Sequence, residues 1–242
     1  MKTIGELNRE WFNTTADSAF KIPWVRALLE QITDFLRGNV EWIGLPAGGD
    51  AGDKNLKMLD YACGNGVAST VIIYALASFV STLRGIDISD GMVEQYNNAA
   101  RSQGLSGEQM RAVQGDLLAH PEKLDSPDLF NFDVIVISAA LHHVEDPAKM
   151  VQRLAERLAS GGSLVVVDGV AASESGCAVP NAEHPAAHTV SRKQGFTKQE
   201  ILDMFSQAGL VDADYRWHPQ RTAMPDEFGG EQQIFFARAK KA

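Results

Sequence analysis

Cysteine is scarce in this chain, with only Cys63 and Cys177 among 242 residues. Two thiols are too few for the disulfide framework of a small secreted protein, so we expect a reducing compartment. Basic residues are also in deficit, because 22 Lys and Arg stand against 31 Asp and Glu, for a formal net charge of -9. Such a surface repels phosphates, so we expect no nucleic-acid partner.

Long apolar runs are missing as well. No segment approaches the roughly 20 apolar residues of a membrane-spanning helix, and residues 1–10 lack the apolar core of a signal peptide. We therefore expect no membrane partner and a cytoplasmic location. The sequence also shows no repeats, no low-complexity tract and no signal for a particular oligomeric state.

Apolar residues make up 45% of the chain, enough for one large domain with a full core. A helix is expected over residues 23–37, with Pro23 in its first turn, and a loop or linker over residues 44–55, which holds four glycines. We therefore predict an N-terminal helical cap and linker in residues 1–55 and the main domain in residues 56–242.

From residue 56 onward, expected strands alternate with expected helices. The strands are predicted at 56–60, 82–87, 112–113, 132–138 and 164–168, with two more near 214–217 and 234–238. Strand–helix alternation is typical of an α/β, Rossmann-like fold with helices on both faces of a mostly parallel, here seven-stranded, sheet.

Two of the expected helices have clear limits. One spans residues 67–79. The other begins at Asp146-Pro147, buries a stripe that includes Leu158, and stops at Gly161-Gly162. Residues 169–192 show no regular pattern, and we expect this irregular segment to roof a substrate site.

Polar side chains follow the expected strands where each one ends. Asp60 lies beside a turn that contains Gly64 and Gly66, Asp87 ends the second strand, and Asp116 follows the third. Ligands of parallel α/β sheets bind at this edge. A turn this poor in side chains lets a ligand approach the backbone closely, and Asp87 can accept hydrogen bonds from both hydroxyls of a ribose.

Four motifs carry a resemblance to a known family. They are Leu-Asp-Tyr-Ala-Cys-Gly-Asn-Gly at 59–66, Gly-Ile-Asp-Ile-Ser at 85–89, Gly-Asp at 115–116 and Ala-Leu-His-His-Val-Glu-Asp-Pro at 140–147. In this order they resemble class I S-adenosylmethionine-dependent methyltransferases, particularly the small-molecule enzymes of the ubiquinone-biosynthesis type. The chain departs from that pattern at Ala62, where the family usually has glycine.

The resemblance implies S-adenosylmethionine as cofactor and assigns positions around it. Asp60 and the backbone of Ala62 and Gly64 would face its methionine part, and Asp87 its ribose. The adenine would contact Ile88, Met92, Asp116 and Leu117, and the sulfonium Ser138 and Ala139.

His142 and His143 follow the fourth strand, near the expected position of the methyl group. Either could act as a general base, with His143 preferred, or could have a structural or cofactor-contacting role. His184 and His188 lie in the irregular segment and either contact the acceptor or are exposed loop residues.

Three aromatic residues of the N-terminal cap, Trp11, Phe12 and Phe20, either line an apolar acceptor pocket or pack the cap on the core. The histidines lack the spacing of a metal site, so no metal is expected.

The favoured hypothesis is a methyltransferase that acts on a small-molecule acceptor through an oxygen, nitrogen, sulfur or carbon nucleophile, a chemistry that also fits secondary metabolism. One alternative is a methyltransferase-like protein that binds S-adenosylmethionine without catalysis. A second is a nicotinamide-dependent dehydrogenase, which is disfavoured because Asp60 would repel a pyrophosphate and Ser69 occupies the third small position of the dinucleotide fingerprint.

Overall fold

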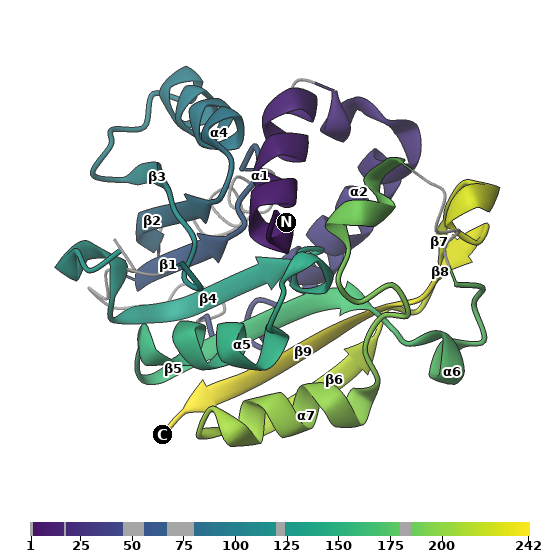
Figure 1. The fold of residues 1–242 in the computed structure, drawn as a ribbon. Coiled ribbons are helices and arrows are strands. Elements are labelled where there is room, and N and C mark those ends of the chain that lie inside the picture. The colour runs from purple at the N-terminus through teal and green to yellow at the C-terminus, as the bar shows by residue number, and fades with distance from the viewer. Residues whose placement is uncertain (1, 17, 46–55, 67–79, 120–123, 180–184) are drawn as a thin grey trace.

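The computed structural model describes residues 2–16, 18–45, 56–66, 80–119, 124–179 and 185–242, and its main feature is one seven-stranded sheet (Figure 1). The strand order is β3-β2-β1-β4-β5-β9-β6. The strands are β1 (Leu56–Tyr61), β2 (Val80–Asp87), β3 (Met110–Gln114), β4 (Phe132–Ser138), β5 (Leu158–Gly169), β6 (Leu210–Trp217) and β9 (Ile234–Lys241). Of these seven strands, β9 alone runs in the opposite direction to the others, which confirms the predicted mostly parallel sheet.

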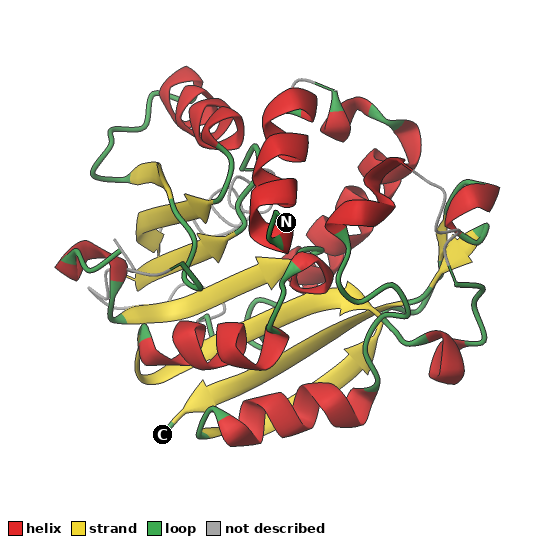
Figure 2. Cartoon of the chain, viewed as in Figure 1, coloured by secondary structure: helices red, strands yellow, loops and turns green. Residues whose placement is uncertain are grey.

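Helices cover both faces of the sheet, as predicted (Figure 2). The α-helices are α1 (Ile4–Thr15), α2 (Pro23–Gly38), α4 (Asp90–Ser102), α5 (Pro147–Glu156), α6 (Ala172–Ser175) and α7 (Lys198–Gln207). The short 3-10 helices are η1 (Ala19–Lys21), η2 (Pro127–Leu129), η3 (Leu141–His143), η4 (Pro185–Thr189) and η5 (Asp226–Phe228). A two-stranded ribbon joins β7 (Thr222–Ala223) to β8 (Glu231–Gln232). The expected helix at 67–79 lies outside the described residues.

One face of the sheet packs against α5 and α7. Alternate residues of a strand point to opposite faces, and on this face Ile135 and Ile137 of β4 meet Leu154 of α5 and Phe205 of α7 in one buried cluster. α7 begins with a capping box, in which the Thr197 hydroxyl accepts from the backbone N–H of Glu200. The buried cluster holds both helices against this face of the sheet.

The opposite face packs against α2 and α4. Val134 and Val136, the intervening residues of β4, share a cluster with Leu36 of α2 and Tyr96 of α4. Fully burying side chains of this size stabilises a fold by about 1.5–3 kcal/mol each. The C-terminal half of α2 therefore belongs to the core of the sheet, although it comes from the predicted cap.

α1 lies beside the arrowheads of β1, β2 and β4 (Figure 1), in contact with α4, η3 and η4. The Thr3 side chain and Glu6 form a capping box at its first turn. Asn13 near its C-terminal end accepts hydrogen bonds from the Ser89 hydroxyl at 2.7 Å and from the Gly91 N–H at 3.2 Å. These bonds dock α1 on the start of α4, over the carboxyl edge of the sheet.

The end of α5 differs from the prediction. The helix ends at Glu156, and Leu158, expected in its buried stripe, is the first residue of β5 and pairs with Phe132. Gly161 and Gly162 lie within a register shift of that strand rather than at the helix end. A Cβ on Gly162 would lie 2.6 Å from the carbonyl oxygen of Phe132, so only glycine fits this bulge.

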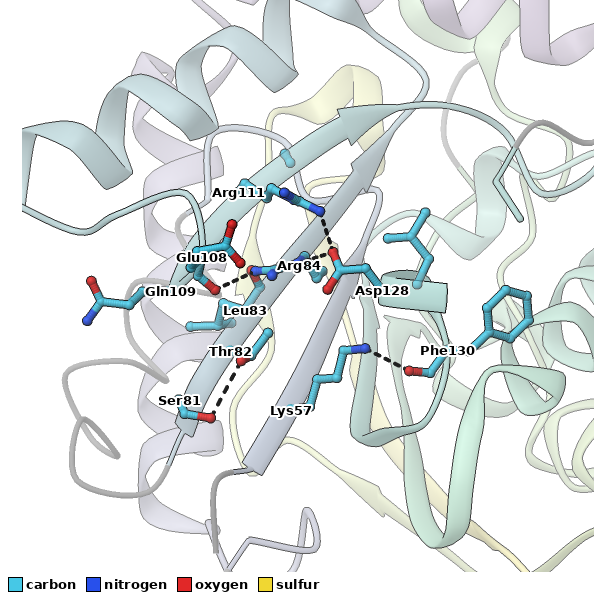
Figure 3. A network of polar contacts seen from close by, with 12 residues as sticks. Lys57, Ser81, Thr82, Leu83, Arg84, Glu108, Gln109, Arg111, Asp128 and Phe130 are labelled. Carbon is cyan, nitrogen blue, oxygen red and sulfur yellow. Dashed lines mark hydrogen bonds and ion pairs between the residues drawn. The ribbon is translucent and has the colours of Figure 1, made fainter. Parts of the chain in front are cut away.

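A network of charged residues ties η2 to the sheet, away from the strands' carboxyl ends (Figure 3). The buried Arg84 of β2 and the half-exposed Arg111 of β3 both donate to Oδ2 of Asp128, at 2.5 and 2.6 Å. The Lys57 ammonium donates to the carbonyl of Phe130 at 2.8 Å. Burial tends to raise the pKa of Asp128, but the two guanidinium groups outweigh it and lower that pKa. The network thus attaches η2 to the sheet and leaves the carboxyl ends of the strands available for a ligand.

Candidate active site

A cavity of about 1130 Å³ lies at the carboxyl ends of the parallel strands, where the strand order reverses between β1 and β4. This is the edge at which α/β proteins of this type bind ligands. The predicted site residues in its wall are Trp11, Phe12, Phe20, Asp60, Ala62, Gly64, Asp87, Ile88, Met92, Asp116, Ser138, Ala139, His142 and His143. Most of the residues chosen from the sequence therefore meet around one cavity.

The turn after β1 is tied to β2. The N–H groups of Ala62 and Cys63 both donate to the carbonyl of Ile86, at 2.7 and 3.2 Å. Ala62 has a φ of 58°, a left-handed conformation that glycine adopts without strain and alanine does not. The left-handed backbone explains why the resembling family usually has glycine at this position. In this chain Ala62 adopts the same conformation at a cost in strain.

Gly64, in the same turn, also has a left-handed backbone, with a φ of 51°. A Cβ there would lie 2.8 Å from Cζ of Phe20. The ring of Phe20, from the N-terminal cap, therefore presses directly on the turn. The absence of a side chain at Gly64 serves this close approach as well as the backbone conformation.

The carboxylate of Asp87 is held by the same turn. It is 6% exposed and accepts from the N–H of Gly64 and from the N–H of Ser89, both at 2.9 Å. Burial raises the pKa of Asp87, and the backbone donors partly offset that rise. A carboxylate has about four acceptor positions, more than these backbone donors occupy, so Asp87 can still accept from a ligand.

The acids at the ends of β1 and β3 flank Asp87. Asp60 is 2% exposed and lies in the cavity wall. Oδ1 of Asp116 accepts from the N–H of Leu118 at 2.9 Å and lies 3.4 Å from the hydroxyl of Tyr61. Burial, followed by the charge of Asp116, raises the pKa of Tyr61, so that phenol stays protonated. The three carboxylates share one wall of the cavity.

Two of the predicted cofactor contacts lie elsewhere. Leu117 is buried in the core, and its N–H donates to the hydroxyl of Tyr61 at 3.3 Å, whereas its neighbour Leu118 lines the cavity. Gly66 is not among the cavity-lining residues either. A Cβ there would come within 3.0 Å of the ring of Tyr96, so this glycine serves packing against α4. The prediction missed the lining leucine by one position because the tip of β3 turns at Asp116.

Ser138 and Ala139 line the cavity where β4 ends. Ala139 also has a left-handed backbone, with a φ of 49°, and its N–H donates to the carbonyl of Val167 at 2.8 Å. This turn bends the chain away from the sheet and leads it into η3, which carries the two histidines.

His142 forms a pair with Asp168, which the sequence analysis did not select. Nδ1 of His142 lies 2.8 Å from Oδ1 of Asp168, and the N–H of His142 donates to Oδ2 at 3.0 Å. Both residues line the cavity. Asp168 stands near the end of β5, as Asp60 and Asp87 stand near the ends of β1 and β2, and that position was a usable signal.

The pair shifts the pKa of both its members. Burial tends to lower the pKa of His142, but the charge and hydrogen bond of Asp168 outweigh it and raise that pKa. Burial tends to raise the pKa of Asp168, but His142 and the backbone N–H groups of His142 and Gly169 outweigh it and lower that pKa.

His143 has a different environment. Its Nδ1 lies 2.9 Å from the carbonyl oxygen of Thr189, and its ring meets Phe12 edge-on at 5.5 Å. Burial, together with the charge of His142, lowers the pKa of His143 to about 3. The two adjacent histidines therefore differ strongly in basicity.

Trp11 also lines the cavity, and its ring lies 5.5 Å from that of His188. His188 itself is not among the lining residues. His184 lies outside the described residues. Of the two histidines expected in the irregular segment, the described one thus supports an aromatic wall residue.

Sequence reasoning missed the apolar side of the cavity. It comes from the first two turns of α2 and from η5 with the preceding loop, and its residues are Trp24, Val25, Leu28, Leu29, Met224 and Phe228. The sequence shows that the apolar residues of α2 recur at helical spacing. It does not show which of them face the core and which face the cavity.

Asn8 of α1 is a second residue that the sequence did not mark. It is 5% exposed, and its amide nitrogen donates to the carbonyls of Ile4, Thr189 and His143, at 2.9, 3.0 and 3.3 Å. The amide oxygen has no hydrogen-bond partner. Asn8 joins α1 to the histidine-bearing wall of the cavity.

Among the described residues, no three His, Cys, Asp or Glu side chains gather as metal ligands would. No helix in the described part of the chain has the length and apolar character to cross a membrane.

Residues 52–209 match the methyltransferase domain family, and the chain belongs to that family. The resemblance to class I S-adenosylmethionine-dependent methyltransferases is thereby confirmed.

Two curated relatives illustrate the sequence similarity. An uncharacterized methyltransferase of Schizosaccharomyces pombe is 30% identical over 72% of this chain and 60% of its own length. The mitochondrial ubiquinone biosynthesis O-methyltransferase of Candida albicans is 32% identical over 46% of this chain and 32% of its own. The chain thus spans less than two thirds of these relatives.

Solved structures share the fold over the whole chain. Geranyl diphosphate C-methyltransferase from Streptomyces coelicolor is similar with a TM-score of 0.69 and 16% identity, covering 100% of this chain and 99% of that one. Magnesium protoporphyrin IX methyltransferase from Synechocystis gives a TM-score of 0.67 and 16% identity, covering 99% of this chain and 100% of that one. At this identity the likeness concerns the fold alone.

Proposed function

We propose that this chain is an S-adenosylmethionine-dependent methyltransferase that acts on a small-molecule acceptor. One observation carries the proposal. The carboxylates of Asp60, Asp87 and Asp116, from neighbouring strand tips, line a single cavity beside the tight turn at Ala62–Gly64.

The residues present fit S-adenosylmethionine. Asp87, with free lone pairs on oxygens already fixed by backbone donors, would hold the ribose hydroxyls. Asp60 would face the cationic methionine part. Ile88, Met92 and Leu118 would contact the adenine, with Asp116 at its edge. Leu118 thus takes the place that the sequence analysis gave to Leu117.

The cofactor supplies a methyl group that its sulfonium has already activated, so the protein's task is mainly to orient the acceptor. Orientation alone can lower a barrier by about 7–11 kcal/mol. Ser138 and Ala139 would lie beside the sulfonium. The aromatic rings of Phe12 and Phe20 line the same space and would exclude water from it once the cofactor is bound.

The cavity is larger than a usual ligand pocket of about 300–1,000 Å³, which supports a site that takes an acceptor beside the cofactor. The apolar side formed by α2 and η5 would hold the acceptor. The names of the ubiquinone biosynthesis O-methyltransferases among the relatives support a small molecule with an apolar part.

We further propose that residues 1–55 act as a cap on the domain at 56–242 and that residues 169–192 contribute to the acceptor site. We also propose that the location is cytoplasmic.

Calorimetric titration of the protein with S-adenosylhomocysteine and, separately, with NAD tests the cofactor. We expect binding of the first and none of the second. Binding of NAD alone would favour a dehydrogenase. Turnover is then followed as transfer of a labelled methyl group to added acceptors. Tight cofactor binding with no transfer to any acceptor would indicate a non-catalytic binding protein.

A further inference from the structure

In the pair formed by His142 and Asp168, the carboxylate of Asp168 is buried and the imidazole of His142 is accessible from the cavity. The Asp168 side chain is 3% exposed, whereas that of His142 is 25% exposed and lines the cavity. A carboxylate only accepts hydrogen bonds, so Nδ1 of His142 is the donor and the lone pair lies on Nε2. Nε2 has no hydrogen-bond partner among the described residues. It is also absent from the side-chain nitrogen and oxygen atoms that are both buried and unpartnered, so part of its surface is exposed. The basic nitrogen is therefore accessible.

His143 does not match this arrangement. Its Nδ1 faces a neutral carbonyl, that of Thr189, instead of a carboxylate. Without a carboxylate partner, its protonated form would be poorly stabilised in a buried position. A base works best when its pKa lies near the working pH, and the pKa of His143, about 3, is far below that range.

The charged and titratable groups around His142 come from three sides. Asp168 faces it from β5, His143 adjoins it in η3, and Arg192 follows η4, with its N–H donating to the carbonyl of His142 at 3.1 Å. The guanidinium of Arg192 pairs with Glu200. Asp168 is the group among these whose charge acts on the His142 pKa.

We propose that His142 is the general base of the proposed methyl transfer, that Asp168 is its positioning residue, and that the acceptor is a hydroxyl compound with an apolar body. The inference rests on the proposed function. It gives His142 the role for which the sequence analysis preferred His143. An acceptor that attacks as a thiolate or a carbon nucleophile already lacking its proton would not need this pair.

In this step the acceptor O–H bond breaks, and its proton passes to Nε2 of His142. The acceptor oxygen forms a bond to the methyl carbon while the bond from that carbon to sulfur breaks. The products are a methyl ether and S-adenosylhomocysteine. The imidazolium, stabilised by Asp168, then returns its proton to water.

The apolar side of the cavity defines the rest of the acceptor. Trp24, Val25 and Leu28 of α2 face the cavity and remain partly exposed, while Ile32 and Leu36 of the same helix are buried. No charged residue of α2 or η5 lines the cavity. An aromatic or aliphatic body would cover these side chains and leave its hydroxyl group at the polar end.

The test begins with nitrogen-15 NMR of histidine in the complex with S-adenosylhomocysteine. We expect neutral His142 to carry its proton on Nδ1 and to titrate above the usual histidine range. In Asp168→Asn its pKa should fall. A neutral tautomer protonated on Nε2, or a titration indifferent to Asp168, would overturn the proposal. Because the readout does not depend on turnover, it separates this proposal from the activity.

Turnover is measured with 2-naphthol, 2-naphthalenethiol and 2-naphthylamine, which differ only in the nucleophile. We expect methylation of 2-naphthol, a rate that rises with pH through the His142 titration, and a kcat lowered by roughly 10²–10⁴-fold in His142→Gln. In Asp168→Asn the acidic limb should move to lower pH. His218→Gln, outside the cavity, is the matched control and should leave the profile unchanged.

Calorimetry with S-adenosylhomocysteine shows whether each variant still folds and binds the cofactor. If the cofactor binds and His142→Gln methylates 2-naphthol at the wild-type rate, the base assignment is wrong while the proposed function stands. Methylation of the thiol or amine alone, or of none of the three probes, would overturn the acceptor class. If the wild-type protein does not bind S-adenosylhomocysteine, the proposed function itself fails.

Discussion

The carboxylate of Asp87 accepts the N–H of Gly64 at 2.9 Å, which joins the tip of β2 to the turn that follows β1. The same carboxylate accepts the N–H of Ser89, the N-cap of α4. One buried side chain thus fixes three segments around the cavity. Its geometry depends on the unusual backbone of Gly64, so the turn and the acid act as a unit.

Asp87→Ala should weaken binding of S-adenosylhomocysteine by roughly 10–150-fold, because a hydrogen bond to a charged group contributes about 1.5–3 kcal/mol. Calorimetry measures the loss. Asp203→Ala, which removes an exposed acid of α7, is the control for general charge effects. Equal affinities in Asp87→Ala and wild type would show that this acid does not hold the ribose.

Ala62→Gly should raise the free energy of unfolding by roughly 0.5–1 kcal/mol. A left-handed alanine costs about 1–2 kcal/mol, which exceeds the extra conformational entropy that glycine brings to the unfolded chain. Urea unfolding checks the sign. Ala27→Gly, at an exposed position in α2, should instead lower stability by about 1 kcal/mol. A loss of similar size in both variants would contradict the strain assigned to Ala62.

Asn8→Asp should loosen α1 from the cavity wall. The substitution places a carboxylate oxygen against the carbonyls of Thr189 and His143, which now accept from the amide. We expect faster hydrogen exchange in α1 and a loss of stability of about 1–3 kcal/mol. Asn98→Asp, at an exposed position of α4, provides the comparison. Unchanged exchange in α1 would mean that Asn8 does not anchor the helix.

His143 predicts a pH dependence of stability. Because its folded pKa of about 3 lies below the usual value of about 6.5, the unfolded chain binds a proton in this interval that the folded chain does not. Stability contributed by His143 is present above about pH 6.5 and declines as the pH falls toward 3, by up to about 1.4 kcal/mol per pH unit.

His143→Gln, which keeps a donor for the Thr189 carbonyl, should flatten this decline. Urea midpoints at pH 6.5, 5.5 and 4.5 measure it, with His218→Gln as control. The raised pKa of His142 acts in the opposite sense, since its contribution is complete below about pH 6.5 and is lost as the pH rises through the folded pKa. An identical acid slope in His143→Gln and wild type would show that His143 is not held neutral.

Much of the fold was accessible from local patterns. The strand at Phe132–Ser138 was predicted at its observed bounds because an unbroken apolar run buried on both faces has few other interpretations. Asp60 and Asp87 were selected because acids at strand tips meet at one edge of a parallel sheet. Both predictions needed only the periodicity of the chain and the rule for parallel sheets.

The missed residues depend on tertiary contacts. The strand-end position of Asp168 could have been read from the sequence, but its pairing with His142, 26 positions earlier, could not. Asn8 is informative only through carbonyls more than a hundred positions later. Leu118 replaced Leu117 because a turn, not the alternation of a strand, decides which side chain faces the cavity. Leu158 was assigned to a helix because apolar spacing alone does not reveal a bulge in a strand.

The division of α2 between two environments has an evolutionary consequence. Its last turns, with Ile32 and Leu36, are shared with the sheet, so replacements there change the stability of the whole protein. Its first turns line the cavity, where Trp24 packs against the ring of Phe228 and the partly buried Leu28 also touches the edge of the cluster that contains Leu36. Homologues could therefore diverge in acceptor preference through the amino-terminal half of this helix while the other half stays under strict selection for folding.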